Sequence, residues 1–446
     1  MNARSIFGRL VDAASGIVRS PAERRAVRLA AILRTLISQR GEASGAALAR
    51  RSLALYRSLD EAGRAHFFDL LARDFSPDRD AVLAAATAYH CDPSPGHLAT
   101  LEQAAEPPRQ EVFRRMNMAP GGTAALLEMR AALAGKLKAH HHWSVIEADL
   151  THLLGSWFNR GFLQLRRIDW STPAAILEKL IAYEAVHEIQ GFPDLKRRLE
   201  RDRRCFAFFH PALEDEPLIF VEVAFVNEMP AAVAPILELG SAVGEPRRAK
   251  CAVFYSITST QAGLRGISFG NFLIKQVAED LHAELPNLKI FATLSPIPGL
   301  RAWARSALHA PRADAAQEAL RTRLADAVAG DGVPPEGLRE ELSGLAAWYL
   351  TRAWSEGQVL DPVARFHLGN GARLERVNWS ADASVKGIAQ SFGLMVNYVY
   401  DLADVERNHE EYFTRRHAAA SGAVERQVRV VEPLFAAEAA PQAAPA

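Results

Sequence analysis

The chain has 446 residues and equal numbers of basic and acidic side chains, 52 Lys and Arg against 52 Asp and Glu. Zero net charge argues against a general nucleic-acid-binding protein, which would show a basic excess. A hydrophobic content of 49% and a charged content of 23% are typical of a globular protein long enough for two or three domains. No apolar run in the sequence is long enough to span a bilayer.

The cysteines and the chain ends indicate a compartment. The three cysteines lie far apart and show neither a Cys-x-x-Cys pair nor a metal-binding spacing, which favours a reducing environment. The N-terminus lacks a signal-peptide core, and Asp12 and Glu23 weaken its resemblance to a mitochondrial transit peptide. We therefore expect a cytoplasmic protein, with the mitochondrial matrix as the less favoured alternative.

Residues 20–157 have the pattern of helices separated by clear breaks. Ser20-Pro-Ala-Glu23 is a capping box with proline at the first helical position. Further helix starts are expected at Ser58-Leu-Asp-Glu61, Ser76-Pro77 and Ser94-Pro95. Short loops between such helices predict an antiparallel bundle. His140-His141-His142 could suggest a metal site, but adjacent side chains diverge on a helix, so a solvated helix end is the default interpretation.

From Phe162 onward the pattern changes to that of a sheet. Strands are expected at 162–168, 205–209, 218–225, 252–257 and 288–292. Helices are expected from Ser171 to Ala185, over 271–281, and across a mostly helical insertion at 311–344. Strands, a helix over the sheet and a helical tail predict an α+β domain. The tail 436–446 is rich in Ala and Pro and is expected to be disordered.

A glycine-bearing loop, Gln261-Ala-Gly-Leu-Arg-Gly-Ile-Ser-Phe-Gly270, joins the fourth predicted strand to the helix that follows. Glycine lets a backbone approach a ligand closely, and free amides at a helix start attract anions. The loop therefore suits a pyrophosphate, and Arg265 and Lys275 could add positive charge. It is neither a Walker A motif nor a Rossmann fingerprint, and a plain strand-to-helix connection is the alternative.

Two further segments contain candidate catalytic residues. In Thr293-Leu-Ser-Pro-Ile-Pro298 a serine leaves a strand end and enters a turn stiffened by two prolines. In Arg365-Phe-His-Leu-Gly-Asn-Gly371 a histidine lies beside a turn and could transfer protons near neutral pH. Taken alone, Ser295 could equally cap the next helix, and His367 could be a satisfied core histidine.

Together, these segments strongly resemble the malonyl-CoA decarboxylase family. The matching pieces include Phe254-Tyr-Ser256, Gly263-Leu-x-Gly266, Gly270-x-Phe-Leu-Ile-Lys275, Leu294-Ser-Pro-Ile-Pro-Gly299, Ala347-Trp-Tyr-Leu350, Phe366-His-Leu-x-Asn-Gly-Ala372, Asn378-Trp-x-Ala-Asp382 and Asn397-Tyr-x-Tyr400. Trp157-Phe-x-x-Gly-Phe-Leu163 and Glu184-Ala-Val-His187 also fit. The resemblance is dense from about Trp157 to Tyr400 and thinner before that.

The resemblance implies an organisation and a ligand. A helical domain, 1–157, would support assembly into a homo-oligomer, with a tetramer as the expected form. A catalytic domain, 158–435, would resemble the GNAT acetyltransferases and bind coenzyme A. The coenzyme A-binding residues would be Gly263, Arg265, Gly266, Ile267, Ser268, Phe269, Gly270, Asn271 and Lys275. Two positions of the usual acetyltransferase loop signature differ here, which weakens acyl transfer more than coenzyme A binding.

The resemblance also implies a reaction. The family's catalytic serine, histidine and tyrosine correspond to Ser295, His367 and Tyr400. We expect decarboxylation of malonyl-CoA to acetyl-CoA and CO2 with no cofactor, because the thioester accepts the electrons itself. In this hypothesis Ser295 and Tyr400 orient the carboxylate, His367 supplies the proton, and backbone amides near 263–270 bind the enolate oxygen.

Two other functions are open at this point. The alternative is a coenzyme A-dependent acyltransferase acting on an amine, with Glu222 as base. The plain interpretation of Glu222 is an edge-strand charge. A coenzyme A-binding regulator would leave Ser295, His367 and Tyr400 unexplained. Neither nucleic acid nor a membrane is expected as a partner, and the sequence leaves open whether malonate use or fatty-acid metabolism is served.

Overall fold

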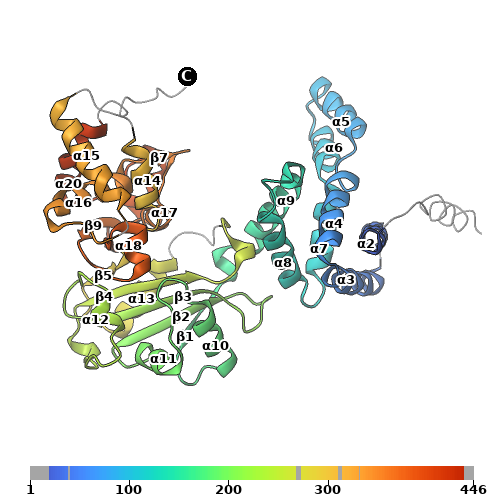
Figure 1. The fold of residues 1–446 in the computed structure, drawn as a ribbon. Coiled ribbons are helices and arrows are strands. Elements are labelled where there is room, and N and C mark those ends of the chain that lie inside the picture. The colour runs from blue at the N-terminus through green and yellow to red at the C-terminus, as the bar shows by residue number, and fades with distance from the viewer. Residues whose placement is uncertain (1–19, 39–40, 268–272, 310–313, 331, 436–446) are drawn as a thin grey trace, which may run out of the picture. The chain divides into compact units, whose positions relative to one another are not determined.

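The computed structural model describes residues 20–38, 41–267, 273–309, 314–330 and 332–435 (Figure 1). The predicted disordered tail, 436–446, therefore lies outside the described residues. The chain divides into two compact units. The first contains the residues up to Leu163, together with His210–Glu214 and the loop that begins at Gln261, and the second contains the sheet and the C-terminal helices.

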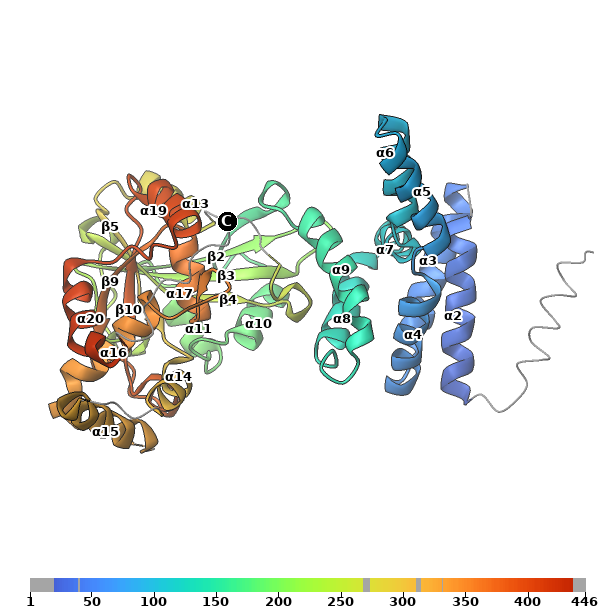
Figure 2. The same ribbon diagram turned by 90° about the horizontal axis from the view of Figure 1, so that it is seen from above.

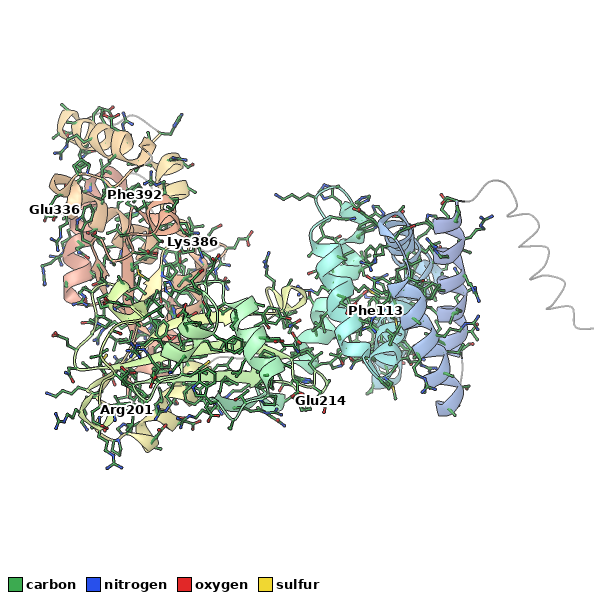
Figure 3. The ribbon with its side chains drawn as sticks, turned by 60° about the horizontal axis from the view of Figure 1, so that its bottom comes forward. Phe113, Arg201, Glu214, Glu336, Lys386 and Phe392 are labelled. Carbon is green, nitrogen blue, oxygen red and sulfur yellow. The ribbon has the colours of Figure 1, made fainter. Side chains whose placement is uncertain are left out.

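The first unit is helical, as expected. Its α-helices are α2 (Pro21–Ser38), α3 (Glu42–Arg57), α4 (Glu61–Asp74), α5 (Arg79–Cys91), α6 (Pro95–Ala105), α7 (Pro108–Asn117), α8 (Gly122–Ala134) and α9 (Ser144–Trp157). Short 3-10 turns are η1 (His141–Trp143), η2 (Arg160–Phe162) and η4 (Ala262–Leu264). Helix α2 packs against α3 and α4, and the core includes the fully buried Phe113 of α7, which Figure 3 labels.

The helix starts follow the predicted capping chemistry in part. The Ser20 amide donates to Glu23 Oε2 at 2.9 Å and the Glu23 amide donates to Ser20 Oγ at 3.2 Å, so the capping box is confirmed. Ser94 caps α6 as predicted. Helices α4 and α5 instead begin after Asp60 and Asp78, whose carboxylates accept the free amides. Nearby aspartates thus replace the predicted serine caps at both places.

The second unit is built on a mixed sheet. Its strands are β1 (Gln164–Ile168), β2 (Arg203–Phe209), β3 (Pro217–Val226), β4 (Cys251–Ser259), β5 (Ile290–Thr293), β6 (Ser295–Pro296), β9 (Arg373–Asn378) and β10 (Met395–Val399). The order is β1-β2-β3-β4-β5-β10-β6, with β9 also pairing with β10. Only β4 and β5 run parallel among these pairs. A separate hairpin contains β7 (Trp354–Ser355) and β8 (Gln358–Val359).

Helices make up most of the rest of the second unit. They are α10 (Ala174–Tyr183), α11 (Phe192–Arg198), α12 (Ala234–Leu237), α13 (Leu273–Glu284), α14 (Leu300–Ala307), α15 (Ala315–Ala329), α16 (Arg339–Thr351), α17 (Pro362–Gly369), α18 (Val385–Ser391), α19 (Val405–Arg415) and α20 (Gly422–Phe435), with 3-10 turns η3 (Pro246–Arg248) and η5 (Glu336–Leu338). Helices α10 and α11 lie on the β1–β3 part of the sheet (Figure 2), where Leu180 and Leu195 join a core with Phe209 and Phe220. The predicted α+β class is confirmed.

The fold positions the site through one crossover. Strand β4 leads through the glycine loop and α13 to β5, its parallel neighbour. Parallel strands need such a crossover connection, and α13 provides it. The parallel pairing ends at Phe254 and Thr293, two residues before Ser295. The described helices include none long and apolar enough to cross a membrane.

Candidate active site

Ser295 lies at a break between two strands. It is the first residue of β6, and Leu294 separates it from the end of β5. Pro296 and Pro298 then direct the chain toward α14, whose N-cap is Gly299. The serine hydroxyl therefore does not cap that helix, because it bonds to two other side chains.

His367 is held by a short helix. It lies in the last turn of α17, whose N-cap residue Asp361 accepts the amides of Val363 and Ala364 at 3.0 and 2.9 Å. The imidazole ring stacks on the ring of Tyr398, with the centroids 4.6 Å apart. The helix and the stacked ring together fix the direction of the imidazole.

The three predicted catalytic residues form one hydrogen-bonded chain. Tyr400 Oη lies 2.8 Å from His367 Nδ1, and His367 Nε2 lies 3.1 Å from Ser295 Oγ. Ser295 Oγ also donates to Thr293 Oγ1 at 2.9 Å. The side chains are almost fully enclosed, since Ser295, His367 and Tyr400 are only 5%, 3% and 1% exposed. The structure thus brings together residues that are far apart in the sequence.

Burial determines the charge of this chain. Burial lowers the pKa of His367 to about 3, and it raises the pKa of Tyr400 well above its usual value. At neutral pH the imidazole and the phenol are therefore both uncharged. An uncharged chain of two hydroxyls and an imidazole can pass a proton along its length without separating full charges.

The glycine loop has two parts with different roles. Gly263 packs against α8 within the first unit: a Cβ there would overlap the Leu127 carbonyl, and Arg130 Nη1 donates to the Gly263 carbonyl at 2.7 Å. Gly266 has φ +78° and open space around its Cα. Gly263 is thus required for packing, and Gly266 for a left-handed turn that glycine adopts freely.

The remaining predicted coenzyme A contacts are only partly described. Arg265 is exposed and Ile267 is buried. Lys275 Nζ, on α13, lies 2.7 Å from Glu406 Oε1 and lowers the pKa of that carboxyl. The predicted contacts Ser268, Phe269, Gly270 and Asn271 lie outside the described residues. The Lys275 ammonium group is thus already paired with a carboxylate of the protein itself.

Glu222 is buried on an interior strand of the sheet. Strand β3 runs between β2 and β4, so the edge-strand interpretation of Glu222 is wrong. The side chain is 1% exposed and its Oε2 accepts from Arg198 Nη1 at 2.9 Å. Burial raises the pKa of Glu222 to about 7, although the charge of Arg198 opposes this shift. A carboxylate enclosed in this way is a poor base for an incoming amine.

The histidine run at 140–142 does not assemble metal ligands. Within the described ranges, no group of three or more His, Cys, Asp and Glu side chains is arranged to hold a metal ion. His142 Nε2 lies 2.7 Å from Asp69 Oδ1, and His140 stacks on Trp143 with the ring centroids 3.9 Å apart. The run forms the turn that leads into α9.

Sequence reasoning missed three residues around the chain. Thr293 bonds directly to Ser295, Tyr398 stacks on His367, and Asp361 starts the helix that carries His367. Thr293 precedes Ser295 by two residues, the spacing that places side chains on one face of a strand. That spacing could have identified it.

Comparison with known proteins identifies the family. A model of the malonyl-CoA decarboxylase C-terminal domain matches residues 161–437, and a model of the N-terminal domain of the same family matches residues 75–158. The chain belongs to the malonyl-CoA decarboxylase family. Among its relatives, the mitochondrial malonyl-CoA decarboxylase of Anser anser anser is 34% identical over 407 residues, covering 82% of this chain and 80% of that protein.

Solved structures of the family show the same fold. The malonyl-CoA decarboxylase of Rhodopseudomonas palustris superposes with a TM-score of 0.85 at 50% identity, covering 90% of this chain and 99% of that chain. The malonyl-CoA decarboxylase of Agrobacterium vitis superposes with a TM-score of 0.82 at 46% identity, with the same coverage. The resemblance predicted from motifs is therefore confirmed across both units.

Proposed function

We propose that this member of the malonyl-CoA decarboxylase family converts malonyl-CoA to acetyl-CoA and CO2 with the chain Ser295–His367–Tyr400. The observation that supports this assignment is the continuous hydrogen bonding of a serine, a neutral imidazole and a phenol, all of which are buried. These are the residues that correspond to the family's catalytic positions.

The course of the reaction explains why uncharged hydrogen-bond donors are sufficient for decarboxylation. Loss of CO2 breaks the bond between the carboxyl carbon and the α-carbon, and the electron pair moves into the thioester carbonyl to form an enolate. The carboxylate must be held so that the breaking bond overlaps that carbonyl, and the enolate oxygen needs nearby donors. The α-carbon then takes a proton. The thioester is the electron sink, so the proposal includes no separate cofactor.

The proton reaches the substrate through the serine. His367 contacts Ser295 with Nε2 and Tyr400 with Nδ1, so both ring nitrogens are occupied by hydroxyls. Ser295 gives its proton to the α-carbon, Nε2–H replaces it, and the Tyr400 hydroxyl proton moves to Nδ1, so the imidazole stays neutral. One proton from water then restores the Tyr400 hydroxyl after each turnover. In this proposal Tyr400 holds the imidazole and replaces its proton, whereas the sequence led us to expect a contact with the carboxylate.

The coenzyme A moiety is assigned to the glycine loop. Gly266 and the exposed Arg265 offer a left-handed turn and a cation. The amides of Leu264, Arg265 and Ile267 already donate inside the loop. The enolate oxygen would therefore have to use other amides than these three.

The helical residues 1–157 are proposed to support assembly. Helix α5 buries only Ala85, and α6 buries none of its residues. Leu83 is 67% exposed and Leu98 is 39% exposed. An apolar surface of this kind is suited to contact another subunit, and we propose a homo-oligomer, with a tetramer as the expected form. We also propose that the protein is located in the cytoplasm.

The function is tested with purified protein and malonyl-CoA. CO2 and acetyl-CoA are followed with and without an amine acceptor. We expect equal amounts of CO2 and acetyl-CoA and no effect of the amine. The Ser295→Ala variant should lower kcat with little change in melting temperature, because one hydroxyl is deleted from a stiff loop. Acyl transfer to the amine without CO2 release would overturn the proposal.

A further inference from the structure

Strands β5 and β6 are two parts of one interrupted strand. The pairs Val399–Ala292 and Val396–Ser295 follow a single antiparallel register along β10. That register places Thr293 opposite Tyr398. The amide of Tyr400 donates to the Phe291 carbonyl at 2.8 Å. Hydrogen-bonded pairs recur at every second residue of an antiparallel ladder, so Thr293 and Tyr398 should form the next one.

At the Thr293–Tyr398 pair, side-chain hydrogen bonds replace the expected backbone hydrogen bonds of the ladder. The Tyr398 amide donates to Thr293 Oγ1 at 3.2 Å. The Thr293 carbonyl instead accepts from Asn397 Nδ2 at 2.8 Å. Asn397 Oδ1 is fixed in turn by Asn378 Nδ2 at 2.8 Å and by Arg376 Nε at 3.2 Å. Thr293, which is completely buried, thus has its hydroxyl built into the sheet.

The threonine oxygen then has a fixed set of partners. A hydroxyl oxygen has two lone pairs and one proton. Thr293 Oγ1 accepts from the Tyr398 amide and from the Ser295 hydroxyl, so both lone pairs are occupied. In the free protein the Ser295 proton therefore points at Thr293, until a bound substrate offers its α-carbon as the acceptor, and Ser295 Oγ accepts from His367. This direction requires the proton of the neutral imidazole to be on Nε2 and makes Nδ1 the acceptor of the Tyr400 hydroxyl.

We propose that Thr293 is a positioning residue that orients the hydrogen bonds of Ser295 and His367 so that the pair donates a proton. The same orientation prevents Ser295 from acting as a nucleophile with His367 as its base. With the opposite direction, Ser295 O–H would donate to Nε2, which is the arrangement that activates a serine. Attack on the thioester would then form an Oγ–acyl bond, break the C–S bond and release coenzyme A as its thiol. The inference rests on the proposed function, since it concerns the same pair.

The test compares three variants. Thr293→Val removes the hydroxyl at nearly constant volume, and Thr293→Ser keeps it. Thr351→Val is the matched control, because Thr351 is equally buried and its hydroxyl donates only to its own helix, to the Ala347 carbonyl at 2.7 Å. We expect Thr293→Val to lower kcat by roughly 10- to 100-fold at little-changed KM. Thr293→Ser should restore most of the rate, and Thr351→Val should retain it.

A second measurement needs no variant of Thr293. Nitrogen NMR of ¹⁵N-histidine-labelled protein, with the His367 signal assigned by its loss in His367→Asn, reports which ring nitrogen holds the proton. The Nε2–H form is expected in the free protein. The Nδ1–H form, or a Thr293→Val variant with normal kcat, would overturn the inference. A wild-type protein without decarboxylation would instead overturn the proposed function, because the NMR result does not depend on the substrate.

Discussion

The sheet unit contains two buried clusters of polar side chains, and they differ in charge. The hydroxyl–imidazole chain, Ser295, His367 and Tyr400, contains no full charge at neutral pH. The ionic cluster, Asp194, Arg198 and Glu222, is a set of ion pairs, with Arg198 2.9 Å from each carboxylate.

The comparison shows that the pKa of a buried group and its suitability for proton transfer are separate properties. Glu222 has a pKa of about 7, which by itself would mark it as a candidate acid or base. His367, with a pKa of about 3, would be passed over. Arg198 already uses the Glu222 carboxylate, whereas the imidazole is linked to two hydroxyls. We therefore propose that hydrogen-bond connectivity is a better guide to the catalytic group than a pKa near neutrality, and four experiments follow from this comparison.

The largest effect is expected for His367→Asn. General acid–base groups contribute about 10²- to 10⁴-fold to a rate, so kcat for decarboxylation should fall by that factor. Binding of free coenzyme A, measured by calorimetry, should change little, because a proton donor acts in the transition state. A variant that keeps most of its turnover would remove His367 from the mechanism.

Breaking the ionic cluster should affect stability. Arg198→Leu leaves the Asp194 and Glu222 carboxylates without their cation, and the free energy of unfolding should fall by about 3–5 kcal/mol. The control is Arg201→Leu (Arg201 is labelled in Figure 3), whose ion pair with Glu245 is exposed, and it should cost less than about 1 kcal/mol. Denaturant unfolding measures both. Normal stability with lost decarboxylation in Arg198→Leu would contradict a structural role.

The pH dependence of unfolding should report the neutral imidazole. Burial on folding lowers the pKa of His367 from 6.5 to about 3. Between pH 6.5 and about pH 3, the unfolded state therefore binds a proton at this residue and the native state does not bind it. Stability contributed by this group is therefore complete above pH 6.5 and is lost as the pH falls. The slope is at most about 1.4 kcal/mol per pH unit. His367→Asn should show a shallower dependence between pH 6.5 and 5, and an identical slope would count against a buried neutral histidine.

The smallest effect is expected at the glycine loop. Gly266→Val should weaken coenzyme A and malonyl-CoA binding about tenfold, because a branched residue disfavours φ +78°. Gly240→Val is the control, since a Cβ at Gly240 meets open space and its φ is outside the left-handed range. Unchanged affinity for free coenzyme A in Gly266→Val would move the phosphate site elsewhere.

Local features of the fold were predictable from the sequence, and their spatial pairing was not. The capping box at Ser20 and the cap at Ser94 depend on neighbouring residues, and both were predicted. The pairing of Ser295 with His367 spans 72 residues, so only the family resemblance linked them. Nothing local to Glu222 shows that β3 is an interior strand, and that expectation failed. The direction of the hydrogen-bond chain depends on a strand register that no motif encodes.

The anchoring of Gly263 affects how the protein can be divided. Arg130 and Leu127 of α8 hold this glycine, although more than a hundred residues separate them in the sequence. A fragment that begins at residue 158 would retain Gly263 and lose both of these contacts. Chimaeras that exchange helical regions between relatives would also exchange one support of the proposed coenzyme A loop. Substrate affinity in such chimaeras should therefore depend on whether residues 127 and 130 are inherited together with the loop they support.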